Sequence, residues 1–348
     1  MPKVTRGFTG FASSMGSSTA ERKSIAPVAL AGESAERGQA KPTIINKEVF
    51  SANNRVRIAV LGLDNFNINH MKNNFLNKLS ILVLSAILLS CNIANDRQPD
   101  FKMLCYNMLR GLQNDSIVKA QYVAWVKKID PDISGYQEMN DFTQKGMEEF
   151  AAQYQHHYAV ISKEWGYPTA VSSKYPIVNV QKVLDNMWHG YIYASINGMH
   201  VFVIHLSPFN VEKRKAEVRQ VLAHAALISQ HEKIVIMGDF NSISDDDVEA
   251  YRDRNLDDEK NVFAVIQAMQ DAGFKDAYRM FHQDFKVSCP SKKYAKSERA
   301  SRIDFVWLNP ELAKYAVSAD YIHDEDTDAM SDHYPLLVEF KFNIKSIK

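Results

Sequence analysis

Nine consecutive residues decide how this chain is interpreted: Ile234-Val235-Ile236-Met237-Gly238-Asp239-Phe240-Asn241-Ser242. The apolar residues at the start, mostly β-branched, predict a short buried strand that ends at Gly238. Because side chains alternate along an extended chain, Asp239 and Asn241 face one side and Phe240 faces the other. A carboxylate and a carboxamide are therefore presented together at the C-terminal edge of a strand, where open α/β sheets place their chemistry. Taken alone, these residues fit an Asx-rich turn after a core strand equally well.

Other segments have the same form, in which an apolar strand adjoins a polar group. They are Phe101–Tyr106 before Asn107, Asp132–Tyr136 before Gln137-Glu138, Val201–Ile204 before His205, Arg302-Ile303 before Asp304, and Ser331-Asp332-His333 before the strand Pro335–Phe342. Any one of these motifs is weak evidence. Together with Gly-Asp-Phe-Asn they form an ordered set, which is strong evidence.

In the identity and order of these motifs, the chain from Phe101 to Phe342 resembles the endonuclease/exonuclease/phosphatase family. This is the metal-dependent phosphoesterase superfamily of pancreatic-type DNase, exonuclease III, neutral sphingomyelinase and inositol-polyphosphate 5-phosphatase. Strands mixed with helices predict an α/β fold. The resemblance sharpens this prediction to two packed mixed β-sheets flanked by helices, which is a four-layered α/β sandwich.

Composition sets broad limits on the protein. The chain has 348 residues, enough for one large domain or two small ones, and 46% hydrophobic with 24% charged residues is ordinary for a globular protein. The formal net charge is zero, so nucleic-acid binding requires a local patch of positive charge. Three cysteines are too few for a disulfide framework.

Residues 1–70 do not resemble the rest of the chain, and we expect a disordered or spurious N-terminal extension there. The stretch Arg55–Gly62 resembles the first strand of a Rossmann dehydrogenase. The residues after it lack the second and third glycines of the dinucleotide fingerprint, which argues against an NAD-dependent oxidoreductase.

Residues 71–91 have the layout of a secretory signal, with a basic start, the apolar run Leu79–Leu89 and a small residue before Cys91. Leu88-Leu89-Ser90-Cys91 resembles a bacterial lipoprotein box, in which Cys91 would be acylated; a buried amphipathic helix is the alternative. We therefore predict an extracytoplasmic protein, either anchored to a membrane through Cys91 or secreted. Residues 92–348 would form one catalytic domain, and Met71 would be the true start.

Sequence periodicity gives a coarse map of this domain. We predict helices at Ile117–Ile129, Phe142–Tyr154, Lys213–Ser229 and Val262–Ala272, the last with Asn261 as N-cap and Gly273 as C-cap. Further strands are predicted at His156–Ile161, Thr169–Lys174 and Ile177–Leu184. Asn197-Gly198 is a strong hairpin signal that joins Tyr191–Ile196 to His200–His205.

A phosphate ester repels a nucleophile, so its hydrolysis needs a cation on the phosphoryl oxygens and a group that activates water. Glu138 is the best metal ligand, because a carboxylate at a strand end suits Mg²⁺, with Mn²⁺ or Ca²⁺ as alternatives. The resemblance implies that Asn107 contacts the metal or the scissile phosphate. It also implies that Asp332 completes the metal shell or contacts the water.

The resemblance suggests roles for the remaining polar residues. Asp239 would activate the attacking water, and Asn241 would donate its amide to a phosphoryl oxygen. His205 matches a histidine of the DNase, sphingomyelinase and 5-phosphatase branches, and argues against a typical abasic-site repair enzyme. His333 would contact the phosphate or serve as general acid, with Asp304 fixing its tautomer.

Two charged stretches and two cysteines allow more than one interpretation. The basic stretch Lys286–Arg302 fits a phosphate-facing loop, with Arg302 as a substrate contact, and fits a solvated loop equally well. For Asp324–Asp328, a solvated acidic loop is favoured over a Ca²⁺ site. Cys105 is predicted to be a buried thiol on a core strand, and nothing in the sequence indicates a disulfide between it and Cys289.

The leading prediction is a monomeric Mg²⁺-dependent phosphoesterase, a nuclease or related phosphodiesterase, exported as a lipoprotein. Its substrate would be a nucleic acid, a phospholipid headgroup or a small phosphate ester, with sphingomyelinase-like or inositol-phosphatase-like activity as an alternative. A non-catalytic surface lipoprotein that uses the same fold for binding is a second alternative. The occupied polar positions count against it.

Overall fold

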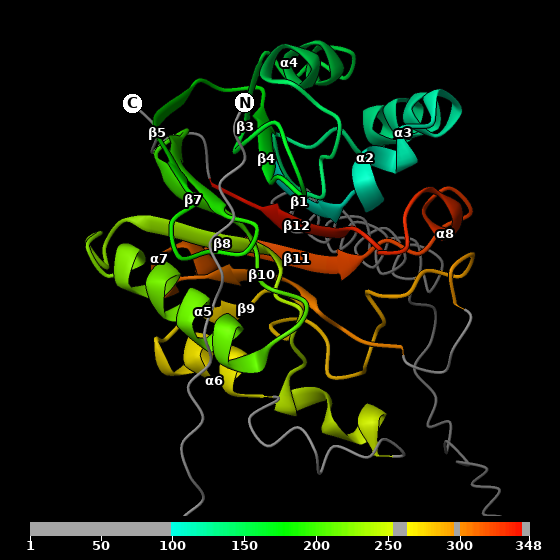
Figure 1. The fold of residues 1–348 in the computed structure, drawn as a ribbon. Coiled ribbons are helices and arrows are strands. Elements are labelled where there is room, and N and C mark those ends of the chain that lie inside the picture. The colour runs from blue at the N-terminus through cyan, green and yellow to red at the C-terminus, as the bar shows by residue number, and fades with distance from the viewer. Residues whose placement is uncertain (1–98, 253–262, 296–299, 343–348) are drawn as a thin grey trace, which may run out of the picture. The chain divides into compact units, whose positions relative to one another are not determined.

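The computed structural model describes residues 99–252, 263–295 and 300–342 (Figure 1). The predictions for residues 1–70, for the signal segment 71–91 with Cys91, and for residues 92–98 lie outside the described residues. None of the described helices is both long and apolar enough to cross a membrane. The fold below is that of the described part of the unit Ile68–Lys348.

The first sheet has six strands and both parallel and antiparallel pairs. Its central strand β1 runs parallel to β2 and antiparallel to β12. The strand order across the sheet is β11 (Ala316–Tyr321), β12 (Leu336–Phe340), β1 (Phe101–Asn107), β2 (Ile133–Gln137), β4 (Ala170–Ser173) and β3 (Tyr158–Ile161).

The second sheet also has six strands, and its parallel pair is β7 with β8. The predicted hairpin is confirmed: Asn197 and Gly198 both have positive φ angles (49° and 71°), as a tight two-residue turn between β6 and β7 requires. The strand order is β5 (Ile177–Val183), β6 (Tyr191–Ile196), β7 (Met199–His205), β8 (Lys233–Asp239), β10 (Asp304–Leu308) and β9 (Lys275–Asp276).

The two sheets pack face to face through a buried apolar layer. Met103 and Cys105 of β1 meet Val203, Met237 and Val306 of the second sheet in this layer. At Gly135 on β2 the sheets approach so closely that a Cβ atom would lie 2.9 Å from the Met237 sulfur and 3.0 Å from Val203. A side chain at that position would have to displace the Met237 and Val203 side chains, so glycine suits the close packing there.

Helices cover the outer face of each sheet. On the first sheet, α3 (Ser116–Ile129) and α4 (Gln144–Ala152) bury aromatic and apolar residues against β1 and β2. On the second, α5 (Val211–Ala225) and α6 (Ala264–Asp271) do the same against β7, β8 and β10. The layers are therefore helix, sheet, sheet and helix, which confirms the predicted four-layered α/β sandwich (Figure 1).

Several short elements link these layers. They are α2 (Leu109–Gln113), η1 (Asp245–Tyr251), α7 (Pro310–Ala313) and α8 (Thr327–Met330). The sequence map contains none of them, because helices of four to seven residues span about two turns or fewer and show little periodicity. It also lacks β9, which has two residues, and β11. Residues Leu109 to Asn114 all have positive φ angles, so α2 is a left-handed turn rather than an ordinary helix.

The predicted boundary of α6 needs a correction. The helix begins at Ala264 after Phe263, which makes no side-chain cap hydrogen bond, whereas Asn261 and Val262 lie outside the described residues. At its other end the C-cap is Ala272, and Gly273 follows with a φ of 83°. The C-cap thus lies one position earlier than predicted, and Gly273 follows it in a left-handed conformation.

Candidate active site

The ends of neighbouring strands bring most of the predicted site residues together at one edge of the sandwich. On the second sheet, Asp239 at the end of β8 lies in register with His205 at the end of β7 and with Asp304 at the start of β10. Across the sheet interface, the Asn107 amide at the end of β1 donates a hydrogen bond of 3.1 Å to Asp239 Oδ2. Residues more than 100 positions apart thus meet around one buried carboxylate.

Gly238 makes this arrangement possible. Its φ is 152°, and a Cβ atom there would lie 1.9 Å from the Ile204 carbonyl oxygen. Only glycine therefore allows β8 to lie so close to β7 just before Asp239. The Asp239 carboxylate also accepts a 2.8 Å hydrogen bond from the Asn241 backbone N–H, and the His205 Nε2 lies 3.5 Å from its Oδ2.

Asp304 and His333 form a buried carboxylate–imidazole pair. His333 Nδ1 lies 2.8 Å from Asp304 Oδ2, and the Ser288 hydroxyl donates a 2.7 Å hydrogen bond to the same oxygen. Burial disfavours a charged imidazole, but the Asp304 carboxylate outweighs this effect and raises the pKa of His333 well above its ordinary value. The other ring nitrogen, Nε2, lies 3.9 Å from Asp239 Oδ2.

The electrostatics of Asp239 are unusual for a carboxylate. Burial, together with the nearby Asp304 carboxylate, raises the pKa of Asp239 to about 8. Within the described residues, its ion-pair partners are the imidazoles of His205 and His333. Burial, and to a smaller extent the neighbouring His189, lowers the pKa of His205 well below its ordinary value. The His205 ring therefore supplies no positive charge at neutral pH.

The predicted metal ligands lie on the same side. Glu138 is half-buried with a positive φ of 58°, and one carboxylate oxygen accepts a 3.1 Å hydrogen bond from the Arg110 N–H of the left-handed turn α2. Burial raises the pKa of Glu138, and Asp332 raises it further. Asp332 is half-buried, with its Oδ1 4.0 Å from His333 Nε2. The carboxylates of Glu138, Asp239, Asp304 and Asp332 thus share one small region.

Such a group of donors fits a divalent cation. Ligand atoms of Asp239, Asp304 and His333 lie within 4.8 Å of one another, and Asp304 Oδ1 is buried without a hydrogen-bond partner among the described residues. Glu138, Asn107 and Asp332 form a second, adjoining oxygen-rich set. Carboxylate and amide oxygens are the donors that Mg²⁺ and Ca²⁺ prefer, and a cation would offset the accumulated negative charge.

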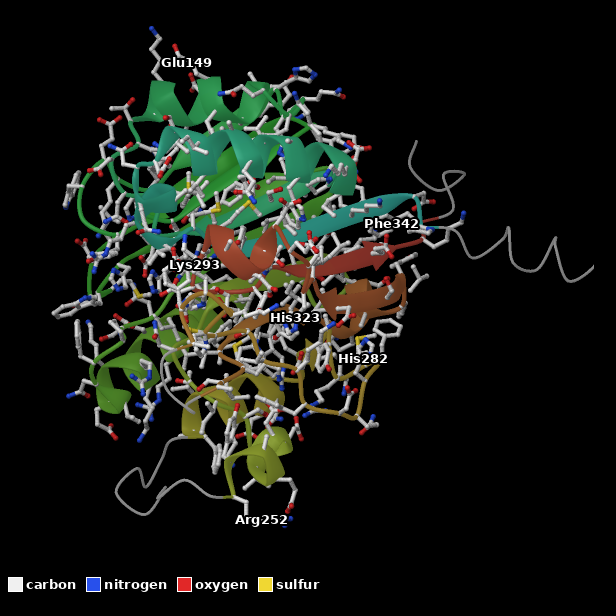
Figure 2. The ribbon with its side chains drawn as sticks, turned by 90° about the vertical axis from the view of Figure 1, so that its right-hand side faces the viewer. Glu149, Arg252, His282, Lys293, His323 and Phe342 are labelled. Atoms are coloured by element: carbon white, nitrogen blue, oxygen red, sulfur yellow. The ribbon has the colours of Figure 1, made fainter. Side chains whose placement is uncertain are left out.

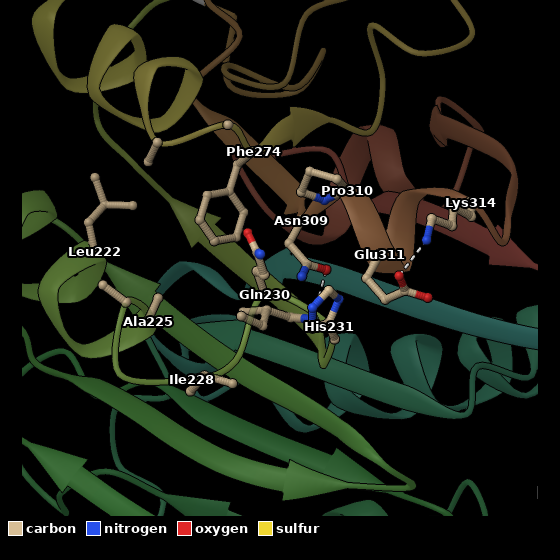
Figure 3. Close-up of a pocket in the computed structure, with 14 residues that line it drawn as sticks. Leu222, Ala225, Ile228, Gln230, His231, Phe274, Asn309, Pro310, Glu311 and Lys314 are labelled. Atoms are coloured by element: carbon tan, nitrogen blue, oxygen red, sulfur yellow. Dashed lines mark hydrogen bonds and ion pairs between the residues drawn. The ribbon is translucent and has the colours of Figure 1, made fainter.

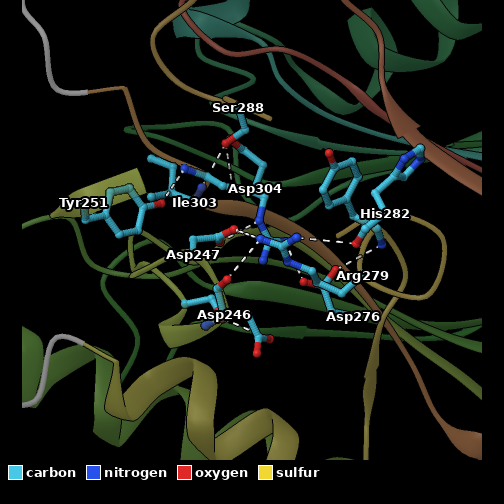
Figure 4. A network of polar contacts seen from close by, with 12 residues as sticks. Asp246, Asp247, Tyr251, Asp276, Arg279, His282, Ser288, Ile303 and Asp304 are labelled. Atoms are coloured by element: carbon cyan, nitrogen blue, oxygen red, sulfur yellow. Dashed lines mark hydrogen bonds and ion pairs between the residues drawn. The ribbon is translucent and has the colours of Figure 1, made fainter. Parts of the chain in front are cut away.

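The prediction that Arg302 binds substrate is wrong. Its guanidinium is fully buried and forms ion pairs with Asp247 and Asp276, two of the acidic residues labelled in Figure 4. Its backbone N–H donates to the Tyr251 hydroxyl. Arg302 therefore fixes the segment that leads into Asp304. The sequence could not show this, because the two carboxylates lie 55 and 26 residues away along the chain.

The described parts of both charged stretches are also paired within the fold. In the basic stretch, Lys286 binds the Asp320 carboxylate and Lys292 binds Asp328, while Lys293 donates to a carbonyl of α8, beside which Figure 2 places it. In the acidic stretch, Asp324 accepts a hydrogen bond from the Trp125 indole. These contacts attach the two loops to the sandwich, so the favoured description of the acidic stretch as simply solvated needs correction.

Three site residues were not identified from the sequence. Ser288 binds Asp304, His189 stacks on His205 with ring centroids 4.0 Å apart, and the Cys289 thiol adjoins His333. Burial raises the pKa of the Cys289 thiol, and Cys105 is a buried free thiol as predicted. No strand-end motif marks these three residues, so sequence patterns gave no signal for them.

A hollow of about 590 Å³ lies where β8 begins, at the opposite end of that strand from Asp239 (Figure 3). Three of its polar side chains serve the fold. Asn309 accepts a hydrogen bond from the Ile234 N–H, and Glu311 pairs with Lys314. The hollow therefore does not compete with the cluster around Asp239 as a catalytic centre.

The site combines a buried acid–imidazole pair with clustered carboxylates on a four-layered sandwich. These are the elements expected of an α/β phosphoester hydrolase with a divalent-metal site. The profile of the Endonuclease/Exonuclease/phosphatase family matches residues 89–333. The chain belongs to this family. A comparison with curated proteins gives no significant match.

Solved structures share the fold. An AP endonuclease from Archaeoglobus fulgidus is 21% identical with a TM-score of 0.56, covering 69% of this chain and 99% of its own. A 3′-5′ exonuclease from Neisseria meningitidis is 21% identical with a TM-score of 0.55, covering 70% and 100%. A 3′ phosphatase from Neisseria bound to a product DNA hairpin is 20% identical with a TM-score of 0.55, also covering 70% and 100%. At these identities the likeness concerns the fold alone.

Proposed function

We propose that this protein is a Mg²⁺-dependent phosphoesterase that hydrolyses phosphodiester or phosphomonoester bonds, as a nuclease or a related phosphodiesterase. The observation that carries the proposal is the Asp239 carboxylate, which lies between the Asp304–His333 pair and His205. This arrangement supplies both a base and an acid within one buried site. The DNA hairpin bound by the Neisseria phosphatase supports a nucleic-acid substrate.

In the proposed mechanism, each side chain handles a proton or holds an oxygen. The Asp239 carboxylate accepts the proton of the attacking water. Asn241 uses one amide hydrogen on the Leu206 carbonyl, at 3.0 Å, and keeps the other for a phosphoryl oxygen. His333 gives its Nε2 proton to the leaving oxygen while Asp304 holds Nδ1, and His205 binds the phosphate.

Glu138, Asn107 and Asp332 would hold the cation. A bound divalent cation would neutralise charge on the phosphoryl oxygens. This assignment leaves the hydrogen bonds between Asn107 and Asp239 and between Asp304 and His333 in place. In the alternative set, Asp239, Asp304 and His333 would hold the cation, which would then contact both members of the Asp304–His333 pair.

Glu138→Gln distinguishes the two metal sets. Loss of a hydrogen-bond partner of a metal ligand typically weakens metal binding about 10- to 100-fold. Because Glu138→Gln removes a charged ligand itself, we expect it to raise the Mn²⁺ dissociation constant at least that much. Electron paramagnetic resonance would measure this constant. Excess Mg²⁺ should recover part of the activity. Glu149→Gln, on the exposed side of α4 (Figure 2), serves as the control. Unchanged Mn²⁺ binding in Glu138→Gln would assign the cation to the other set.

The enzymatic proposal has a direct test. Protein spanning residues 92–348 should release p-nitrophenol from bis(p-nitrophenyl) phosphate, and EDTA should abolish the reaction. A panel of oligonucleotide, sphingomyelin and inositol-phosphate substrates should then show the highest kcat/KM on the oligonucleotide. No hydrolysis of any substrate with Mg²⁺ or Mn²⁺ would favour the alternative, a non-catalytic binding protein on this fold.

We also propose export as a lipoprotein, which rests on Leu88-Leu89-Ser90-Cys91 in the sequence. In a bacterial host, Cys91→Ser should move the protein from the membrane fraction to a soluble or unprocessed form. Cys289→Ser, a matched change within the domain, should leave fractionation unchanged. Identical fractionation of Cys91→Ser and the wild type would exclude acylation at Cys91. We expect the domain to be monomeric, which size-exclusion chromatography with light scattering would test.

A further inference from the structure

Two exposed aromatic rings meet beside the candidate active site. Trp188, in the loop between β5 and β6, is 52% exposed, and Phe209, between β7 and α5, is 77% exposed. Their ring centroids are 5.4 Å apart at an interplanar angle of 73°. Large aromatic rings that stay this exposed contribute little to the core, so their contact with each other calls for another role.

A buried carboxylate holds the two loops together. Glu217 on α5 is fully buried, and its two oxygens accept hydrogen bonds from the backbone N–H groups of Trp188 and Ser207. Ser207 lies two residues before Phe209 in the same loop. The Trp188–Phe209 pair is therefore held in place by the scaffold beneath it, which reduces the entropy that a ligand must overcome on binding.

Stacked imidazoles connect this pair to the catalytic carboxylate. The Trp188 and His189 rings have centroids 6.5 Å apart, and His189 stacks on His205 at 4.0 Å with an interplanar angle of 15°. His205 Nε2 in turn lies 3.5 Å from Asp239 Oδ2. A continuous series of rings thus runs from the protein surface to the candidate active site.

Polar groups along this series lack partners in the fold. His189 and His205 are 5% and 2% exposed, and neither His189 Nε2 nor His205 Nδ1 has a hydrogen-bond partner among the described residues. Leaving such buried groups unsatisfied is costly, so these two nitrogens keep the region between the aromatic pair and Asp239 polar. Burial lowers the pKa of both imidazoles, and the positive charge of the half-buried Lys163 lowers it further. Lys163 has no carboxylate within ion-pair distance in the described parts of the chain. Its ammonium group favours an anion.

We propose that Trp188 and Phe209 bind an unpaired nucleobase while the half-buried Lys163 binds the adjoining phosphate, which makes single-stranded nucleic acid the substrate class. This inference rests on the proposed phosphoesterase function and adds the substrate to it. Aromatic rings that stack bases beside a cation are the usual elements of sequence-tolerant single-strand binding. A lipid surface fits less well, because the patch adjoins an unpaired ammonium group and buried imidazoles rather than a broad aliphatic surface.

Matched oligonucleotides test the subsite. The wild type should cleave an oligothymidylate with a KM lower than that of an abasic oligonucleotide of equal length. Trp188→Ala and Phe209→Ala should each raise the KM for oligothymidylate roughly 5- to 150-fold, the range for loss of one base-stacking contact. Both should leave the KM for the abasic substrate within about twofold. Trp188→Phe, which keeps an aromatic face, should largely restore the KM.

Leu227→Ala provides a control for loss of an exposed apolar side chain. Leu227 is 85% exposed and follows the C-terminal end of α5, whose 15 residues separate it from Phe209 by about 22 Å. Its KM values should equal those of the wild type. The melting temperature of each variant, compared with that of the wild type, shows whether a raised KM reflects a folding defect.

The possible outcomes separate this inference from the proposed function. If the wild type cleaves neither oligonucleotides nor bis(p-nitrophenyl) phosphate, the proposed function fails. If it cleaves both oligonucleotides with equal KM, or if Trp188→Ala leaves the KM for oligothymidylate unchanged, the subsite is refuted. Binding of the wild type to sphingomyelin–phosphatidylcholine vesicles that is lost in Trp188→Ala, with unchanged oligonucleotide kinetics, would overturn the nucleic-acid assignment in favour of a lipid surface.

Discussion

Asp239→Asn should lower kcat by about 10²- to 10⁴-fold, the range for loss of a general base, with little change in KM. The carboxamide keeps an oxygen for the Asn241 N–H but cannot accept the proton of the attacking water. Because the lost interaction belongs to the transition state, substrate binding should be largely preserved. Steady-state kinetics on bis(p-nitrophenyl) phosphate at saturating Mg²⁺ would measure this loss.

Asp320→Asn is a matched control, because Asp320 lies on β11, outside the candidate site, and its carboxylate pairs with Lys286. It should leave kcat within about twofold, since one surface ion pair contributes little. Recovery of Asp239→Asn by excess Mg²⁺ would contradict the proposed role and would make Asp239 a metal ligand.

The raised pKa of Asp239 also predicts how stability depends on pH. Burial and Asp304 raise its pKa in the fold from 3.8 to about 8, so the folded state binds this proton more tightly than the unfolded state does. In metal-free protein, the stability that protonated Asp239 contributes is therefore lost as the pH rises from 3.8 to about 8. Asp239→Asn should reduce the fall in melting temperature between pH 5 and pH 8, measured in EDTA by circular dichroism. An unchanged fall would contradict the shift.

His333→Ala should lower kcat/KM on an oligonucleotide by about 10²- to 10⁴-fold, because the leaving oxygen would no longer receive a proton. The loss should be much smaller on bis(p-nitrophenyl) phosphate, because p-nitrophenolate leaves without protonation. Asp304→Asn should act like a weaker form of the same change, because it leaves the imidazole in place but removes the carboxylate that orients it at 2.8 Å.

A double-mutant cycle tests whether the two residues act as a unit. If Asp304 works through His333, the variant carrying both changes should be far less impaired than the product of the two single losses predicts. Fully multiplicative losses would show that the pair does not act as one group. An equal loss on both substrates in His333→Ala would exclude His333 as the general acid.

The sequence alone was sufficient for the fold class. Strands mixed with helices predicted an α/β protein, and the family resemblance carried by strand-end residues such as Asn107, Glu138 and Asp239 sharpened this to a four-layered sandwich. The structure confirms the layers and brings Asn107, His205 and Asp239 within hydrogen-bond or ion-pair distance. The prediction succeeded because strand periodicity and the glycine at position 238 are local properties of the sequence. The ends of neighbouring strands must also lie together in a sheet.

Tertiary structure alone decided which charges face the site. Arg302 precedes the strand of Asp304, and its position in a basic stretch predicted a phosphate contact. The structure instead buries it between Asp247 and Asp276. Ser288 and His189, which contact Asp304 and His205, carry no motif at all. Burial and ion pairing depend on partners that the fold supplies from distant parts of the chain. Local sequence patterns set which way a strand faces, but they do not specify which charged side chains the packed sheets neutralise.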